Sequence, residues 1–225
     1  MCGRERASMR PERWGFYFIT DSNLTKQGAI RDAGDALRGG AKVVQYREKN
    51  KSPAEMLEEA KALLVLCNSS GADLIINDDP ELARTVGAQG VHIGQGDRPL
   101  ADARKVLPDG IVGVSCGTVE EVLLAERGGA DYVAASPVFF TSTKKDIGTP
   151  VGLEGLARMR EATELPIIAI GGITIANVRD VVLAGADSAC GISATVGTPD
   201  VSASVREFEG LVRAARTERT SRSRS

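Results

Sequence analysis

Short runs of apolar and β-branched residues recur along the chain. Each is followed by a polar turn and then by a longer segment with apolar positions at helical spacing. This alternation predicts strands at residues 16–20, 43–47, 73–77, 90–93, 111–115, 132–135, 167–170 and 188–192. Eight strands alternating with helices in one chain of 225 residues predict an α/β protein, a single (β/α)8 barrel. A doubly wound open sheet is the alternative, although no GxGxxG sequence follows the first strand.

Local signals mark where the predicted helices begin and end. Ser52-Pro53-Ala54-Glu55 has the pattern of a capping box with proline at the first helical position, and Thr118 to Glu121 repeats the Thr-x-x-Glu pattern. Gly-Ala followed by a polar residue recurs with the alanines at positions 41, 72, 88, 130 and 186. Glycine there supplies a left-handed helix cap before the next strand. The alanines lie 31, 16, 42 and 56 residues apart, which corresponds to one, one, two and two βα units.

Composition sets the limits of the folded domain. Apolar residues make up 42% of the chain, ample for one core, and aromatic residues only 4%, so the core rests on Val, Ile, Leu and Ala. We expect residues 1–14 to be a disordered or extended tail, 15–215 to form the barrel, and 216–225 to be a second tail. This last segment contains only Arg, Thr, Ser and one Glu, which cannot form a core.

Charge and cysteine content exclude several classes of protein. A net charge of −2 gives no general attraction to nucleic acid or to an anionic membrane. No apolar stretch approaches the roughly 20 residues that span a bilayer. The four cysteines form no CxxC pair and have no histidine nearby, so neither a disulfide framework nor a zinc site is expected. We therefore expect a cytoplasmic protein with reduced thiols and small-molecule partners, and we leave homo-oligomer formation open.

Polar clusters directly follow several predicted strands. They are residues 45–49, 77–79, 92–97 and 141–146. The carboxyl ends of barrel strands meet at one mouth, which is where such barrels carry their active sites. Asp78 and Asp97 follow neighbouring strands, and Mg²⁺ prefers one or two carboxylates plus water and phosphate oxygens, so this pair is a candidate magnesium site. Alternatively Asp78 caps the following helix, although Asp79 fits that position before Pro80 better.

Cations and glycines at the same mouth predict phosphate binding. Arg47 can grip a phosphate with two parallel hydrogen bonds, and Lys49 and Lys144 add mobile positive charge. Gly171-Gly172 follows a strand and precedes a predicted helix start, where free backbone N–H groups meet phosphate oxygens. Strand eight is predicted to end near Ile192-Ser193, close to another helix start. The loops after strands seven and eight frequently hold a phosphate in such barrels.

The chain offers little for nucleophilic or acid–base catalysis. His92 is the only histidine, and it lies within a predicted strand, so we expect a hydrogen-bonded core or supporting residue rather than a catalytic base. Cys116 follows a strand end, but no histidine is positioned by sequence to activate it. A metal–diphosphate site suits this mixture of carboxylates and cations better than a hydrolytic triad.

Six segments taken together resemble the thiamine-phosphate synthase family. They occur in order with barrel spacing, and the match covers nearly the whole barrel, from Tyr17 to Ala194. The segments are QYREK at 45–49, NDD at 77–79, HIGQGD at 92–97, GVS at 113–115, TSTKKD at 141–146 and AIGGI at 169–173. The resemblance implies that hydroxymethylpyrimidine diphosphate and a thiazole phosphate are joined, forming thiamine phosphate in thiamine biosynthesis and releasing diphosphate.

The resemblance also implies roles for individual residues. Mg²⁺ would be the cofactor, bound by Asp78 and Asp97. The pyrimidine diphosphate would contact Gln45, Arg47, Lys49, Asn77, Ser115 and Lys144. The thiazole phosphate would contact Thr141, Thr143, Gly172, Ile192 and Ser193. Within the same segments, further substrate contacts are expected from Tyr46, Glu48 and Ser142. The expected catalytic residues are Lys144, Arg47 and Ser115.

The family chemistry agrees with these residue types. In the family, diphosphate leaves first, and the thiazole nitrogen captures the resulting pyrimidine-stabilised carbocation. That nitrogen already carries a lone pair, so no general base is required. The leaving group needs charge neutralisation, from Mg²⁺, Lys144 and Arg47, and the two substrates must be held in line.

The chain departs from the family pattern at two places, and three other functions stay open. Phe140 stands where proline usually precedes Thr-x-Thr, and Gly191-Ile192-Ser193 replaces a more apolar lead-in. A thiazole tautomerase would lack much of the pyrimidine diphosphate site, and a non-catalytic regulator would not need metal ligands. In a sugar-phosphate epimerase, Asp78 and Asp97 would be an acid–base pair, but the surrounding cations do not require one.

Overall fold

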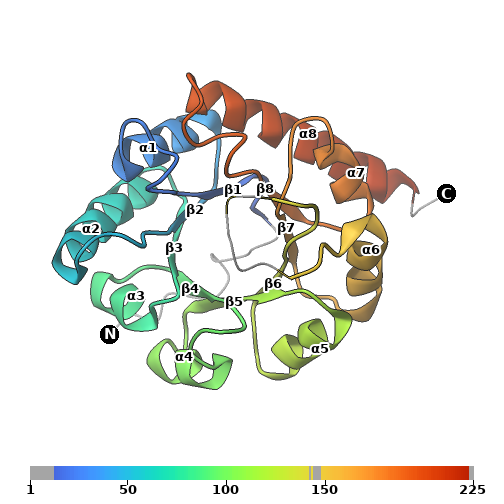
Figure 1. The fold of residues 1–225 in the computed structure, drawn as a ribbon, viewed down its shortest axis with the longest axis horizontal. Coiled ribbons are helices and arrows are strands. Elements are labelled where there is room, and N and C mark those ends of the chain that lie inside the picture. Colours follow the sequence, from blue (N-terminus) through green and yellow to red (C-terminus); the bar gives the residue numbers. More distant parts are fainter. Residues whose placement is uncertain (1–12, 142, 144–147, 223–225) are drawn as a thin grey trace.

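Eight parallel strands, hydrogen-bonded in the order β1 to β8, form the centre of the computed structural model, which describes residues 13–141, 143 and 148–222. The strands are β1 Tyr17–Ile19, β2 Val43–Tyr46, β3 Asp73–Asn77, β4 Gly90–Ile93, β5 Ile111–Cys116, β6 Tyr132–Ala135, β7 Ile167–Ile170 and β8 Ser188–Cys190. A bridge between Phe16 and Ala189 joins the first strand to the last. The sheet therefore closes into a barrel, as Figure 1 shows.

Helices surround this barrel on the outside (Figure 1). They are α1 Ala29–Gly39, α2 Pro53–Ser69, α3 Pro80–Val86, α4 Leu100–Val106, α5 Val119–Arg127, α6 Gly152–Ala162, α7 Val178–Leu183 and α8 Val201–Arg222. The prediction of a single (β/α)8 barrel is confirmed, and the closed ring excludes an open sheet. Each predicted strand is present, with ends that differ by at most two residues. No helix in the described part of the chain is long and apolar enough to cross a membrane.

One of the two predicted capping boxes is complete. The Ser52 side chain accepts from the Glu55 N–H, and the Glu55 carboxylate accepts from the Ser52 N–H. Thr118 likewise accepts from the Glu121 N–H, but the Glu121 carboxylate accepts from the Gly117 N–H at 2.6 Å. The second box is therefore displaced by one residue, because the carboxylate reaches the N–H before the cap.

Trp14 closes the amino-terminal end of the barrel interior. Its ring lies edge-on to Tyr17 and Tyr132, with centroids 5.4 and 5.2 Å away, and its Nε1 donates to Asp73 at 2.7 Å. The side chain is fully buried. The barrel thus begins earlier than the predicted boundary at residue 15, because the large ring fills the space between strand ends. Residues 1–12 of the predicted tail lie outside the described part of the chain.

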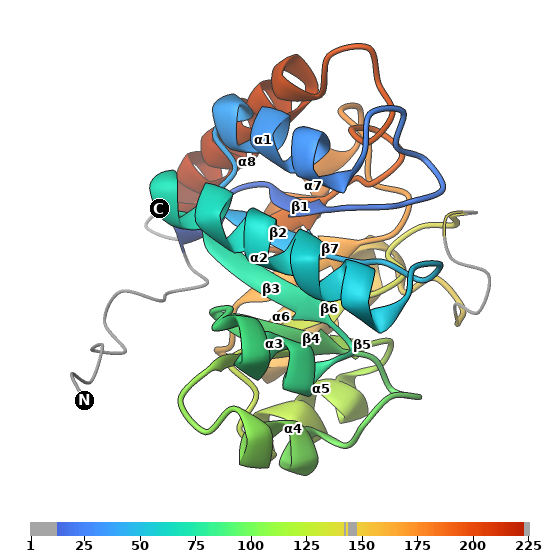
Figure 2. The same cartoon turned by 90° about the vertical axis from the view of Figure 1, so that its left-hand side faces the viewer.

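The C-terminal segment differs from the solvated tail that its composition predicts. Helix α8 continues to Arg222 and packs between α1 and α7 (Figures 1 and 2). Arg216 donates to the Trp14 carbonyl at 2.8 Å, and Arg219 donates to the carbonyls of Val182 and Ala186 at 2.8 and 2.7 Å. Arginine adds little to an apolar core, but its several N–H donors can bond to backbone carbonyls at the edge of the barrel.

Candidate active site

A cavity opens at the carboxyl ends of the strands, where the sequence predicts the site. Residues from each of the eight strands or the loop after it line the cavity. They are Ile19, Gln45, Arg47, Asn77, His92, Ser115, Ser136, Thr141, Thr143, Ile170, Gly171, Gly172, Ile173, Cys190, Gly191, Ile192 and Ser193. The structure therefore brings most of the predicted substrate-binding residues to one hollow.

Arg47 is held in place by a buried carboxylate that the sequence analysis does not single out. Its Nη1 donates to Asp21 Oδ2 at 2.9 Å, and Asp21 is 2% exposed. The Arg47 backbone is also fixed, because its N–H donates to the Thr20 hydroxyl, which in turn donates to the Arg47 carbonyl. The guanidinium keeps further donors for a ligand, so this anchored cation can bind an anionic group in the cavity.

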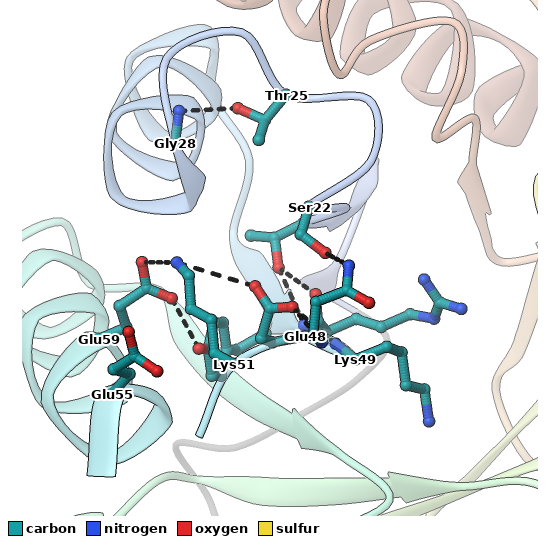
Figure 3. A network of polar contacts seen from close by, with 12 residues as sticks. Ser22, Thr25, Gly28, Glu48, Lys49, Lys51, Glu55 and Glu59 are labelled. Carbon is teal, nitrogen blue, oxygen red and sulfur yellow. Dashed lines mark hydrogen bonds and ion pairs between the residues drawn. The ribbon is translucent and has the colours of Figure 1, made fainter. Parts of the chain in front are cut away.

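Glu48 makes several polar contacts in the loop after β2 (Figure 3). It is not among the residues that line the cavity. Its Oε1 accepts from the N–H groups of Lys49 and Asn50 at 2.7 and 2.8 Å, and its carboxylate also bonds to Ser22. Burial acts to raise the pKa of this carboxyl, but these hydrogen bonds and Lys51 outweigh it and lower the pKa. Glu48 is therefore placed to fix the loop that carries Lys49, and the structure does not bring its side chain to the predicted site.

Tyr46 also lies away from the cavity. Adjacent residues of a strand point to opposite faces, and Gln45 points inward, so Tyr46 points outward to helix α2. Its hydroxyl donates to Glu59 Oε2 at 2.7 Å. The structure therefore does not bring Tyr46 to the substrate cavity as predicted, because the period of the strand places it between the sheet and a helix.

Asp78 and Asp97 meet beside the cavity, as predicted for a metal-binding pair. Their carboxyl groups are in hydrogen-bond contact, and Lys49 Nζ lies 2.5 Å from Asp78 Oδ2. Burial raises the pKa of Asp78, the neighbouring Asp97 raises it further, and Lys49 acts in the opposite direction. Asp97 also accepts from the Gly94 N–H at 2.7 Å. Two carboxyl groups are thus held against each other at the mouth, with an ammonium group beside Asp78.

The backbone of Asp78 is adapted to this position. Its φ is 63°, in the left-handed region that aspartate tolerates better than most residues, and its N–H donates to the His92 carbonyl at 2.8 Å. Asp79 supplies the N-cap of α3 by accepting from the Leu82 N–H at 2.9 Å. The alternative that Asp78 is the cap is therefore excluded, and its carboxylate is available to the mouth.

The loops after β6, β7 and β8 form the opposite side of the cavity. Gly172 has a φ of 66°, and a Cβ there would lie 2.6 Å from the Phe140 carbonyl, so glycine allows these two loops to run close together. Thr141 and Thr143 lie on the same side and are linked through their hydroxyls. The Phe140 side chain is 82% exposed. The predicted thiazole phosphate residues thus come from three neighbouring loops.

The local structure of these loops is not the predicted one. Helix α7 begins at Val178, several residues after Gly172, because the Asn177 side chain closes a turn onto the Thr174 N–H at 2.8 Å. Ile192 begins a turn, and its carbonyl accepts from the N–H groups of Thr195 and Val196. The helix starts expected directly after both strands are therefore replaced by turns. Predicted residues Ser142 and Lys144 lie outside the described part of the chain.

The cavity also contains residues that the sequence analysis leaves out. These are Ile19, Ser136, Ile170 and Cys190, which point inward at the ends of β1, β6, β7 and β8. The alternation of side chains along a strand indicates these positions, because each lies two residues from another inward-facing residue of the same strand or loop. His92 lies in the cavity wall as well, with its Nε2 2.9 Å from Ser115 Oγ. This agrees with the predicted supporting role.

Fold and site together define a class: a barrel enzyme that binds phosphorylated compounds at the carboxyl end of its strands. The model of the family "Thiamine monophosphate synthase" matches residues 16–195. The thiamine-phosphate synthase of Chloroflexus aurantiacus is 44% identical over 88% of this chain and 93% of its own length. That of Methanospirillum hungatei is 46% identical over 88% and 97%. The solved thiamine phosphate pyrophosphorylase of Pyrococcus furiosus is 35% identical, with a TM-score of 0.85 over 92% of this chain and 98% of its own.

The chain belongs to the thiamine monophosphate synthase family. The resemblance expected from the six sequence segments is therefore confirmed, and the chain is a transferase of thiamine biosynthesis.

Proposed function

We propose that this mouth joins 4-amino-2-methyl-5-hydroxymethylpyrimidine diphosphate to 4-methyl-5-(2-phosphoethyl)thiazole, giving thiamine phosphate and diphosphate. Family membership supports the activity. The observation that supports the placement is that two separate sets of potential anion-binding groups line one cavity. Arg47 follows β2, and Gly172 and Ser193 lie in the loops after β7 and β8. Two substrates that each carry phosphate can thus meet between them.

The diphosphate end lies between Arg47 and the Asp78–Asp97 pair. Among the described residues, no group of three or more potential metal-binding side chains gathers, so protein ligands alone do not surround a cation. Two carboxylates that leave the other positions to water and diphosphate oxygens fit Mg²⁺. When bound, Mg²⁺ would neutralise charge on the departing diphosphate. Arg47 adds directed hydrogen bonds, and Lys49, which pairs with Asp78, adds positive charge beside them.

The thiazole phosphate end uses neutral donors. Thr141, Thr143 and Ser193 offer hydroxyls, and the backbone at Gly172 also lines the cavity. This end carries no described cation in the cavity wall, so it suits a single phosphate group better than a diphosphate. The asymmetry orients the two substrates, with the diphosphate toward Arg47 and the thiazole phosphate toward the loops after β6, β7 and β8.

The reaction is a substitution at the pyrimidinylmethyl carbon. The bond from this carbon to the diphosphate oxygen breaks, and the electron pair leaves with diphosphate. The thiazole nitrogen then forms the new bond with its own lone pair, so no side chain has to remove a proton. Arg47 stabilises the leaving group, Ser115 holds the pyrimidine, and the predicted role of Lys144 at the diphosphate stays a prediction.

The alternative functions are less well supported. A tautomerase has no use for an anchored Arg47 beside paired carboxylates, and a non-catalytic regulator has no use for the pair Asp78 and Asp97. Identities above 40% to thiamine-phosphate synthases over most of the chain also favour the synthase. Location in the cytoplasm and homo-oligomer formation stay predictions.

The test incubates purified protein with both substrates and Mg²⁺ and follows thiamine phosphate. We expect product that disappears when a chelator is added and returns when excess Mg²⁺ is restored. A chain that binds the thiazole phosphate and forms no product would contradict the synthase function. Product that persists in chelator would instead remove the magnesium role and leave the coupling reaction in place.

A further inference from the structure

A continuous chain of hydrogen bonds crosses the barrel interior below the cavity. Gln45 Nε2 donates to the Tyr17 hydroxyl at 2.9 Å, and this hydroxyl lies 2.8 Å from that of Tyr132. The Tyr132 hydroxyl lies 3.0 Å from His92 Nδ1, and His92 Nε2 lies 2.9 Å from Ser115 Oγ. The chain therefore begins and ends on Gln45 and Ser115, which both line the cavity.

The Tyr132 phenol at the centre of these hydrogen bonds is closely surrounded. A Cβ at Gly113 would lie 2.4 Å from the Tyr132 hydroxyl and still closer to its ring, so glycine leaves the space that the phenol occupies. Trp14 supports both tyrosine rings from below. Burial raises the pKa of Tyr17 and Tyr132, so both phenols keep their protons at neutral pH.

The direction of each hydrogen bond follows from the first one. Because the amide N–H of Gln45 can only donate, Tyr17 accepts and must pass its single proton to Tyr132. In this direction Tyr132 would donate to Nδ1 of His92, and the imidazole would carry its proton on Nε2. That proton would be donated to Ser115 Oγ, which would leave the Ser115 hydroxyl proton for a ligand.

We infer that His92 is a positioning residue that links Gln45 and Ser115, the two ends of this series of hydrogen bonds. The site therefore presents an acceptor at Gln45 Oε1 and a donor at the Ser115 hydroxyl. The inference rests on the proposed function of the cavity. An aminopyrimidine offers the complementary groups, an amino donor and ring-nitrogen acceptors. A 4-oxopyrimidine offers the reverse pattern, and accommodating it requires every link, including the imidazole tautomer, to reverse together. This series of hydrogen bonds thus selects an aminopyrimidine over a 4-oxopyrimidine.

Because His92 is the only histidine, the imidazole can be observed without interference. Protein labelled with ¹⁵N-histidine and free of any tag should show the Nε2–H tautomer alone by NMR, without substrate present. Tyr132→Phe keeps the ring and removes the donor to Nδ1, so both tautomers should then appear. An Nδ1–H tautomer or a fully protonated ring in the unchanged protein would overturn the inference.

Kinetics supply the second readout. Tyr132→Phe should raise KM for the pyrimidine diphosphate about threefold to tenfold, the effect of one weakened hydrogen bond, and leave KM for the thiazole phosphate unchanged. Ser188→Ala is the matched control, because it also removes a buried hydroxyl. This hydroxyl donates to the Gly15 carbonyl and takes no part in the hydrogen bonds between Gln45 and Ser115. Equal KM changes for both substrates, or the same change in the control, would overturn the inference.

Failure of this inference and failure of the proposed function can be distinguished. The NMR experiment needs no turnover, so an active synthase with the Nδ1–H tautomer contradicts only the hydrogen-bond direction. A protein that makes no thiamine phosphate and shows the Nε2–H tautomer contradicts only the proposed function.

Discussion

The two ends of this barrel use the same residue types for different purposes. At the amino-terminal end, Asp131 and Asp187 each accept a backbone N–H of a neighbouring strand, from Val112 and Ile167, and each is paired with arginine. Asp187 contacts two arginines, Arg160 and Arg219. At the carboxyl-terminal end, two aspartates face each other instead.

This difference separates stability from function. A carboxylate that is fully paired has no capacity left for a ligand, and its contribution is to hold neighbouring elements together. Burial raises the pKa of Asp78, and the facing Asp97 carboxyl raises it further, so it is unfavourable for both groups to be ionised together. A cation relieves that cost. The division agrees with the general rule that barrels keep chemistry at the carboxyl ends of their strands.

Loss of the facing carboxylates should have the largest effect on turnover. Asp78→Asn and Asp97→Asn should each lower kcat/KM by at least about a hundredfold, because charge on the leaving diphosphate is no longer neutralised. Asparagine tolerates the left-handed backbone at Asp78 and can keep the Gly94 hydrogen bond at position 97. Circular dichroism should be unchanged. Full activity in both variants would remove the metal assignment.

The amino-terminal end should respond in the opposite way. Asp187→Asn breaks contacts to Arg160 and Arg219 and should lower the free energy of unfolding by about 2 kcal/mol. Urea titration measures this loss, and kcat and both KM values should stay at the level of the unchanged protein. A large fall in kcat with little loss of stability would contradict the division between the two ends.

Loss of Asp21, the partner of Arg47, should have a smaller effect on the mouth. Asp21→Asn removes a charged partner of the guanidinium, so KM for the pyrimidine diphosphate should rise about threefold to tenfold in steady-state assays. Asp35→Asn is the control, because Asp35 pairs with the exposed Arg38 on α1. We expect no change in that variant, and similar KM values in both variants would argue against the support role of Asp21.

The smallest expected effect is that of Glu209 on the pH dependence of stability. Its carboxylate accepts from the Phe16 N–H at 2.9 Å, and burial raises its pKa above the ordinary 4.5. A raised pKa means that the folded protein binds this proton more tightly than the unfolded chain does. The resulting stability is present below about pH 4.5 and is lost as pH rises through the raised value. Glu209→Gln should lack that loss.

Urea titrations across this range should therefore show that the Glu209→Gln variant gains stability relative to the unchanged protein as pH rises. Glu207→Gln, on the exposed face of the same helix, is the control and should follow the unchanged protein. Parallel pH curves for all three proteins would show that Glu209 has the same pKa in the folded and unfolded states.

The sequence predicts the barrel well because the strand and helix periods are local properties. The family resemblance does not place Tyr46, because it covers the whole segment 45–49, whereas the period of a strand sends alternate residues outward. It also misses the contact of Asp21 with Arg47, because the two residues lie 26 positions apart and only closure of the barrel brings them together. The role of His92 depends on partners from two other strands, which no local pattern reveals.

The C-terminal residues show a different limit. Composition describes whether a segment can build a core, and residues 216–222 cannot. It does not describe which backbone carbonyls the rest of the fold leaves for Arg216 and Arg219 to satisfy.

Binding of inorganic diphosphate tests, without turnover, whether the mouth is a metal–diphosphate site. Isothermal titration should show binding in the presence of Mg²⁺, little binding in chelator, loss of binding in Asp97→Asn and unchanged binding in Asp187→Asn. Binding of equal strength with and without Mg²⁺, unaffected by Asp97→Asn, would contradict the account.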